Sequence, residues 1–126
     1  MRLHILAVGR LKPGPERDLC DDYLTRARGL GRKAGISAIA EREFAESQLG
    51  TAALRQAAEA KMITDALPAR ALTILLDERG RDMTSPAFAD TLRSRLDEGT
   101  ADLAFLIGGP DGHDASLRAS AALVIG

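Results

Sequence analysis

Leu103 to Gly112 reads LAFLIGGPDG, an unbroken apolar run that stops at two glycines, a proline and a third glycine. A short apolar run bounded by turn residues predicts a strand buried on both faces, which is typical of a parallel sheet. The glycines then lie at the carboxyl edge of the sheet. Open α/β sheets bind ligands at this edge, and a residue without Cβ lets backbone amides approach a ligand. We therefore expect Gly108 and Gly109 to belong to a binding site.

Apolar runs and helical periodicities alternate along the rest of the chain. Short apolar runs predict further strands at residues 3–8, 36–40, 72–76 and 123–125. Apolar residues at three- and four-residue spacing predict helices at about 16–29, 51–67, 86–98 and 115–121, the third of them capped by Ser85. Strands that alternate with helices favour an α/β fold with a mainly parallel sheet flanked by helices.

Composition restricts the class of protein. A chain of 126 residues with 28% charged and 45% hydrophobic residues is typical of one ordered domain. The net charge of −1 gives no general attraction to nucleic acid, so RNA contact requires a local basic patch. The chain has a single cysteine, Cys20, so it cannot form an internal disulfide. We interpret Cys20 as a small packed residue rather than as a nucleophile. With no signal peptide and no membrane span, we expect a soluble cytoplasmic protein without a membrane partner.

A basic run near the end of the first predicted helix is the candidate patch. It consists of Arg26, Arg28, Arg32 and Lys33, and Arg10 and Lys12 stand in an earlier loop. Two interpretations are open: a solvated helix end, or a patch that contacts RNA phosphates. Three Phe, one Tyr and no Trp do not support an aromatic platform for splayed bases.

Acids and a histidine follow the predicted strands, where functional loops sit. They are Asp77, Glu78, Asp111, His113 and Asp114. His113 is either a general base or a solvated loop histidine, and the catalytic residue stays unassigned. His4 lies within a strand and reads as a packed histidine. One cysteine and two separated histidines predict no metal site, and the absence of GxGxxG and GxxxxGK[ST] disfavours nucleotide triphosphate chemistry.

Three segments together resemble one family. LHILAVGRLK at residues 3–12, LLDERGRDMTSPAFADTL at 75–92 and FLIGGPDG at 105–112 are similar to the ribosomal RNA large subunit methyltransferase H family. The resemblance runs in order over essentially the whole chain. It implies a SPOUT-type α/β fold with a carboxyl-terminal trefoil knot, and a homodimer. It also implies transfer of a methyl group from S-adenosylmethionine to N3 of a pseudouridine in 23S rRNA of the ribosome.

The resemblance also implies a cofactor site. It places Leu76, Gly108 and Gly109 against S-adenosylmethionine, together with the residues Leu123, Val124, Ile125 and Gly126. A leucine at a strand end beside a glycine loop suits this role, because adenosine needs an apolar slot and backbone polar groups. Methyl transfer from an activated sulfonium requires mainly positioning and deprotonation of the target nitrogen.

The carboxyl end departs from the family pattern. The chain stops at Ala-Leu-Val-Ile-Gly, whereas family members continue through a Leu-Pro-His type motif and a final helix rich in Arg and Tyr. We expect residues 1–126 to form one methyltransferase domain that is incomplete after Gly126, where the knot segment would follow. Two other interpretations remain open: a non-catalytic α/β interaction module, and a small nucleotide-binding protein of doubly wound type.

Overall fold

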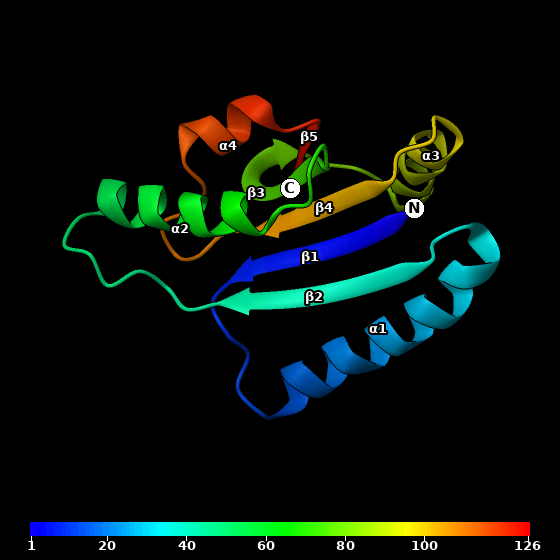
Figure 1. Cartoon of the computed structure of the whole chain (residues 1–126). Helices are drawn as coiled ribbons and strands as arrows, with labels where there is room; N and C mark the ends of the chain where they lie inside the picture. The colour runs from blue at the N-terminus through cyan, green and yellow to red at the C-terminus, as the bar shows by residue number, and fades with distance from the viewer.

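A computed structural model describes residues 1–126 and contains five strands and four helices in strict alternation (Figure 1). In chain order they are β1 (Arg2–Val8), α1 (Pro15–Ala34), β2 (Ala38–Phe44), α2 (Ala52–Ala66), β3 (Leu72–Arg81), α3 (Ser85–Asp97), β4 (Asp102–Ile107), α4 (Ala115–Ser120) and β5 (Leu123–Ile125). The expected α/β class is confirmed.

All five strands form one sheet in the order β2-β1-β4-β3-β5, and every neighbouring pair is parallel. The carboxyl ends of β1, β3 and β4 therefore meet at one edge. The β3–β4 ladder ends where Leu76 stands opposite Ile107, which is the last residue of β4, whereas β3 continues to Arg81.

Helices pack on both faces of the sheet. On one face, Ala60 and Ile63 of α2 and Leu117 of α4 pack with Leu75 and Leu106. On the other face, Leu92 of α3 packs against a smaller cluster centred on Ile74 and Leu103. The first helix, α1, runs beside the edge strand β2 (Figure 1). The strands between these two layers of helices form the buried core of the domain.

Several element boundaries differ from the predictions. β2 spans Ala38–Phe44 rather than 36–40, because Glu41 and Glu43 pair with Arg17 of α1 and are thereby tolerated in a strand. α1 continues through Gly29 and Gly31 and ends at Gly35, which has a φ of 96°. Helix α3 is likewise capped by Thr84, whose side chain accepts the Ala87 N–H, and not by Ser85.

The helix faces also differ from those predicted by apolar spacing. Leu19 and Tyr23 of α1 are exposed, and the lone Cys20 beside them is half-buried. In α2, Leu54 is exposed, whereas Glu59 and Ala60 are buried. Arg55 and Gln56 of α2 face the protein because they bond to Asp111 in the loop after β4.

β3 is longer than predicted and bends around the end of β5. Leu76 and Arg81 both pair with Ile125, so the intervening residues bulge around it. Gly80 sits at the closest point of this bend. A Cβ on Gly80 would lie 2.3 Å from the carbonyl carbon of Ile125, a distance that real Cβ atoms do not reach.

Gly80→Ala should therefore destabilise the domain by at least about 2 kcal/mol, because backbone atoms of Ile125 cannot move aside as a flexible side chain would. The matched control is Gly29→Ala: nothing lies within 4 Å of that Cβ, and alanine in a helix interior should add about 0.5–1 kcal/mol. Chemical denaturation of both variants tests the bend. Equal stability of the two variants would contradict it.

A buried carboxylate joins β1 and β4 at the amino-terminal ends of the two strands. Asp102, which is only 6% exposed, accepts hydrogen bonds from Arg2 Nη2 and His4 Nε2, both at 2.8 Å. His4 is thus the packed, hydrogen-bonded histidine that its position in a strand predicts. The bonds from His4 first, and then from Arg2, lower the pKa of Asp102 below its ordinary 3.8.

Asp102→Asn should lower the free energy of unfolding by about 1.5–3 kcal/mol at neutral pH, since hydrogen bonds to a charged acceptor are lost. Because the folded-state pKa is depressed, this advantage of the wild type is complete above the ordinary aspartate pKa. It disappears as the pH falls through the lowered value. Denaturation at pH 7, 5 and 3 measures it, with the exposed Asp65→Asn as control. If wild type and Asp102→Asn differ in free energy of unfolding by the same amount at pH 7 and pH 3, the ionised Asp102 carboxylate does not have this stabilising role.

Candidate functional site

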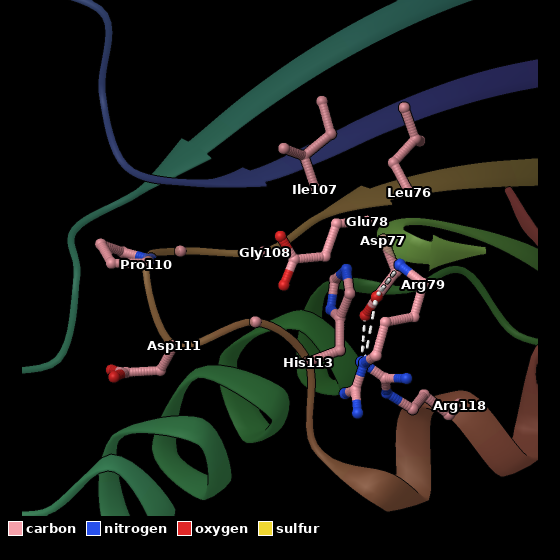
Figure 2. Close-up of a pocket in the computed structure, with 12 residues that line it drawn as sticks. Leu76, Asp77, Glu78, Arg79, Ile107, Gly108, Pro110, Asp111, His113 and Arg118 are labelled. Atoms are coloured by element: carbon pink, nitrogen blue, oxygen red, sulfur yellow. Dashed lines mark hydrogen bonds and ion pairs between the residues drawn. The ribbon is translucent and has the colours of Figure 1, made fainter. Parts of the chain in front are cut away.

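A hollow of about 280 Å³ opens at the carboxyl edge of the sheet, between the ends of β3 and β4 and the start of α4 (Figure 2). Its lining consists of residues 76–79, 107–113 and Arg118. The sequence-predicted Leu76, Gly108 and Gly109 are all among them. The structure therefore brings together the strand-end leucine and the glycine loop, although they are more than thirty residues apart in the chain.

Two apolar side chains form one side of the hollow. Leu76 is 40% exposed and its register partner Ile107 is 39% exposed, whereas the preceding Leu75 and Leu106 are completely buried. The side chains therefore become exposed at the last paired position of the β3–β4 ladder. The pair presents an apolar surface to the hollow, which suits the flat ring of a nucleoside.

The glycine loop supplies backbone groups beside this surface. Gly112 donates its N–H to Gly109 O at 2.9 Å, while the N–H groups of Gly108 and Gly109 donate to no backbone carbonyl. A Cβ on Gly108 would lie 3.3 Å from His113 Nε2, and one on Gly109 would lie 3.1 Å from Val8 Cγ1. Glycine is thus favoured by the packing behind the loop, and two amide donors stay free for a ligand.

Helix α2 holds the loop from behind. Arg55 donates to both carboxylate oxygens of Asp111, at 2.7 and 3.2 Å, and Gln56 Nε2 donates to Asp111 O at 2.6 Å. The hydrogen bond from Arg55 lowers the pKa of the Asp111 carboxyl group. Asp111 is consequently an anchor of the loop, and it stays ionised through the neutral range.

Glu59, one turn further along α2, lies beneath the same loop. It is only 3% exposed, and its Oε2 accepts the Ser47 N–H at 2.9 Å. Its Oε1 has no partner and lies 3.4 Å from the position a Cβ would take on Gly109. A buried carboxylate is costly unless fully hydrogen-bonded, so this residue marks a second point at which α2 contacts the loop.

An ion pair closes the other side of the hollow. Asp77 accepts the Arg79 N–H at 2.9 Å and bonds to Arg118 Nη2 of α4, as the dashed lines in Figure 2 indicate. The backbone bond from Arg79 first, and the bond from Arg118 after it, lower the pKa of Asp77. Glu78, by contrast, is exposed and is in no ion pair with a side chain of the protein.

The two remaining loop candidates have structural contacts. His113 is only 6% exposed, and its Nε2 lies 3.2 Å from Leu106 O; because a carbonyl only accepts, the ring donates its proton there. It is therefore not the solvated loop histidine that the sequence allowed. Asp114 caps α4 by accepting the Leu117 N–H at 3.0 Å.

Other predicted site residues lie outside the hollow. Residues 123–126 do not line it: Leu123 and Ile125 belong to β5 and pack against the cluster around Ile74, and Gly126 lies against the bend near Gly80. The basic residues from Arg26 to Lys33 lie in the second half of α1. That half of the helix runs toward the amino-terminal edge of the sheet, away from the hollow (Figure 1).

Arg55, Gln56, Glu59 and Arg118 were missed by sequence reasoning. The available signal was the presence of three polar residues at positions 55, 56 and 59 on one face of an alanine-rich helix. Two absences complete the description: no three His, Cys, Asp or Glu side chains gather as metal ligands would, and no helix has the length and apolar character required to cross a membrane.

Comparison with known proteins places this geometry in context. A family model described as a predicted SPOUT methyltransferase matches residues 1–126. The chain is 46% identical over 125 residues to ribosomal RNA large subunit methyltransferase H of Brucella anthropi, covering 99% of this chain and 78% of that protein. It is 48% identical over 121 residues to the protein of the same name from Ruegeria pomeroyi, covering 96% and 75% of the two chains.

Arg55→Ala should loosen the glycine loop without unfolding the domain, because it removes the side chain that holds the Asp111 carboxylate. The pKa of Asp111 should then rise toward its ordinary 3.8, and the Gly112 amide should exchange faster with solvent. Nuclear magnetic resonance measures both quantities. Lys61→Ala removes an exposed ion pair from the same helix and serves as control. An unchanged Asp111 pKa in the Arg55 variant would contradict this role.

Proposed function

Because this chain belongs to the SPOUT methyltransferase family, we propose that it methylates ribosomal RNA of the large subunit with S-adenosylmethionine as methyl donor. The specific reaction proposed is methylation of N3 of a pseudouridine in 23S rRNA. The observation that carries the proposal is the hollow at the carboxyl edge, where Leu76 and Ile107 stand beside the free amides of the glycine loop. Relatives named ribosomal RNA large subunit methyltransferase H support the substrate class.

The residues of the hollow fit the proposed cofactor. Leu76 and Ile107 offer an apolar surface to the adenine, and the N–H groups of Gly108 and Gly109 offer donors to its polar edge or to the ribose. The proposed contribution of residues 123–126 would come from the strand that pairs with Leu76 on its other side. The ion pairs of Asp77 and Asp111 keep both walls fixed.

The cofactor, when bound, supplies an activated methyl group on a sulfonium. The protein then has to hold the acceptor nitrogen in line and exclude competing water. Removal of the N3 proton requires an acceptor at the mouth of the hollow. Asp77, Asp111 and His113 are each engaged in hydrogen bonds within the protein, so none is a free acceptor in this structure. Glu78 is the pocket carboxylate that is in no ion pair.

The proposal includes the organisation that the resemblance implies. Residues 1–126 would form one methyltransferase domain, acting as a homodimer in the cytoplasm on assembled ribosomes. The trefoil knot of the class belongs to the same expectation.

A methyl-transfer assay tests the proposal. The protein is incubated with labelled S-adenosylmethionine and large ribosomal subunits, and the digested RNA is analysed by mass spectrometry. The expected product is a pseudouridine of 23S rRNA that carries a methyl group on N3. Label at another nucleoside of the purified RNA, or no label in the RNA at all, would overturn the proposal. Stronger thermal stabilisation by a flavin or nicotinamide cofactor than by S-adenosylmethionine would support the nucleotide-binding alternative instead.

Leu76→Asn should weaken S-adenosylmethionine binding about tenfold, because an apolar contact worth about 1–1.5 kcal/mol is lost. Leu54→Asn is the matched control, since Leu54 is an exposed leucine on α2 that does not line the hollow. Calorimetric titration of both variants gives the affinities. If both variants bind the cofactor like the wild type, the assigned site is wrong.

A further inference from the structure

Three of the nine cations that are in no salt bridge lie in the last two turns of α1, namely Arg28, Arg32 and Lys33. Eight of the seventeen lysines and arginines form salt bridges with carboxylates. Within the predicted basic patch, Arg26 is neutralised by Asp22 at 2.9 Å and stacks on the ring of Tyr23. Arg28 and Arg32, which follow it on the helix, are in no salt bridge. The structure thus separates residues that the sequence grouped together.

These two arginines face a small hollow. It has a volume of about 200 Å³ and lies between the last turns of α1 and the beginning of β2. Its lining is Arg28, Arg32, Ile36, Ser37, Ala38 and Ile39, with no carboxylate among them. The space is smaller than the hollow at the carboxyl edge and is lined by two guanidinium groups, so it suits a single negatively charged group better than a nucleoside.

Arg28 is already oriented for binding. Its Nε donates to Ile39 O at 2.9 Å, which ties the guanidinium to β2 and leaves its two terminal nitrogens without an acceptor in the protein. A guanidinium presents paired donors that match two oxygens of a phosphate. Because the side chain is held before the ligand arrives, little rotamer freedom remains to be lost on binding.

A purely structural role for these arginines is less consistent with the contacts. Cations near a helix carboxyl end can bond to its last carbonyl groups. Here the N–H groups of Gly35 and Ile36 both donate to Gly31 O. Neither Arg28 nor Arg32 bonds to a carbonyl of α1, since Arg28 bonds to β2 instead.

We propose that the hollow between Arg28 and Arg32 binds a backbone phosphate of the RNA substrate, at the opposite edge of the sheet from the methyl-transfer hollow. This inference rests on the proposed function for the identity of the RNA. The strands between the two edges have six or seven residues, or about 20 Å at 3.3 Å per residue. Such a span corresponds to about six phosphates along one strand of a helix. The site therefore acts in docking the RNA, and not in the chemical step.

The test compares an Arg28→Ala/Arg32→Ala double variant with Arg26→Ala, a control that removes an arginine from the same helix. Binding of the full chain to large ribosomal subunits is measured by cosedimentation between 50 and 300 mM salt. In the double variant the slope of log K against log salt should become shallower by about 1–2, with at least a tenfold loss of affinity at low salt. The control should keep the wild-type slope. S-adenosylmethionine affinity and the unfolding midpoint should be unchanged in both.

A second pair of variants separates charge from geometry. Arg28→Lys/Arg32→Lys keeps both positive charges, so it should retain most of the salt slope while losing affinity through the missing bidentate bonds. A wild-type slope in the alanine double variant would overturn the inference. So would equal competition by polyglutamate and RNA, which would indicate an acidic protein partner. Failure of the wild type itself to bind large ribosomal subunits would refute the proposed function, and the phosphate site with it.

Discussion

Burial of β4 on both faces is the constraint on which the rest of the molecule depends. Leu103, Ala104 and Leu106 are completely inaccessible to solvent, with helices on either side of the sheet. A strand in that position has no solvent-facing side, so a polar residue there needs partners within the protein, as Asp102 has in Arg2 and His4. Its parallel neighbours have to reach it through helical crossovers. All strands then run in one direction and end at one edge. The apolar run has to stop where the helices no longer cover it, and the glycine loop begins there.

Electrostatics organise the two ends of the sheet differently. At the carboxyl edge the carboxylates are paired with arginines: Asp77 with Arg118, and Asp111 with Arg55. These pairs hold the walls of the hollow and leave it nearly neutral. At the far end of α1, Arg28 and Arg32 have no carboxylate beside them. One edge is therefore suited to a small polar molecule with an apolar ring, and the other to a diffuse negative charge.

Local sequence was sufficient for some features and not for others. The glycine loop and Leu76 were predictable because a buried parallel strand leaves its signature in consecutive residues. The orientation of α2 was not, because Arg55 bonds to Asp111, which lies 56 positions away in the chain. The end of β2 was missed for the same kind of reason, since Arg17 compensates the glutamates within the strand. The environment of such side chains is set by a distant partner and cannot be predicted from periodicity, as Arg55, Gln56 and Arg118 show.

The bend of β3 around β5 has a mechanical consequence. Ile125 pairs with Leu76 on one side of the bend and with Arg81 on the other, so β5 cannot slide by one residue unless both pairs break. The bend also carries Asp77, which is bonded to Arg118 of α4. Residues 123–126 are therefore connected to the wall of the hollow through β3 and the Asp77–Arg118 pair. The register of β5 and the placement of Asp77 at the hollow thus depend on the same bend of β3.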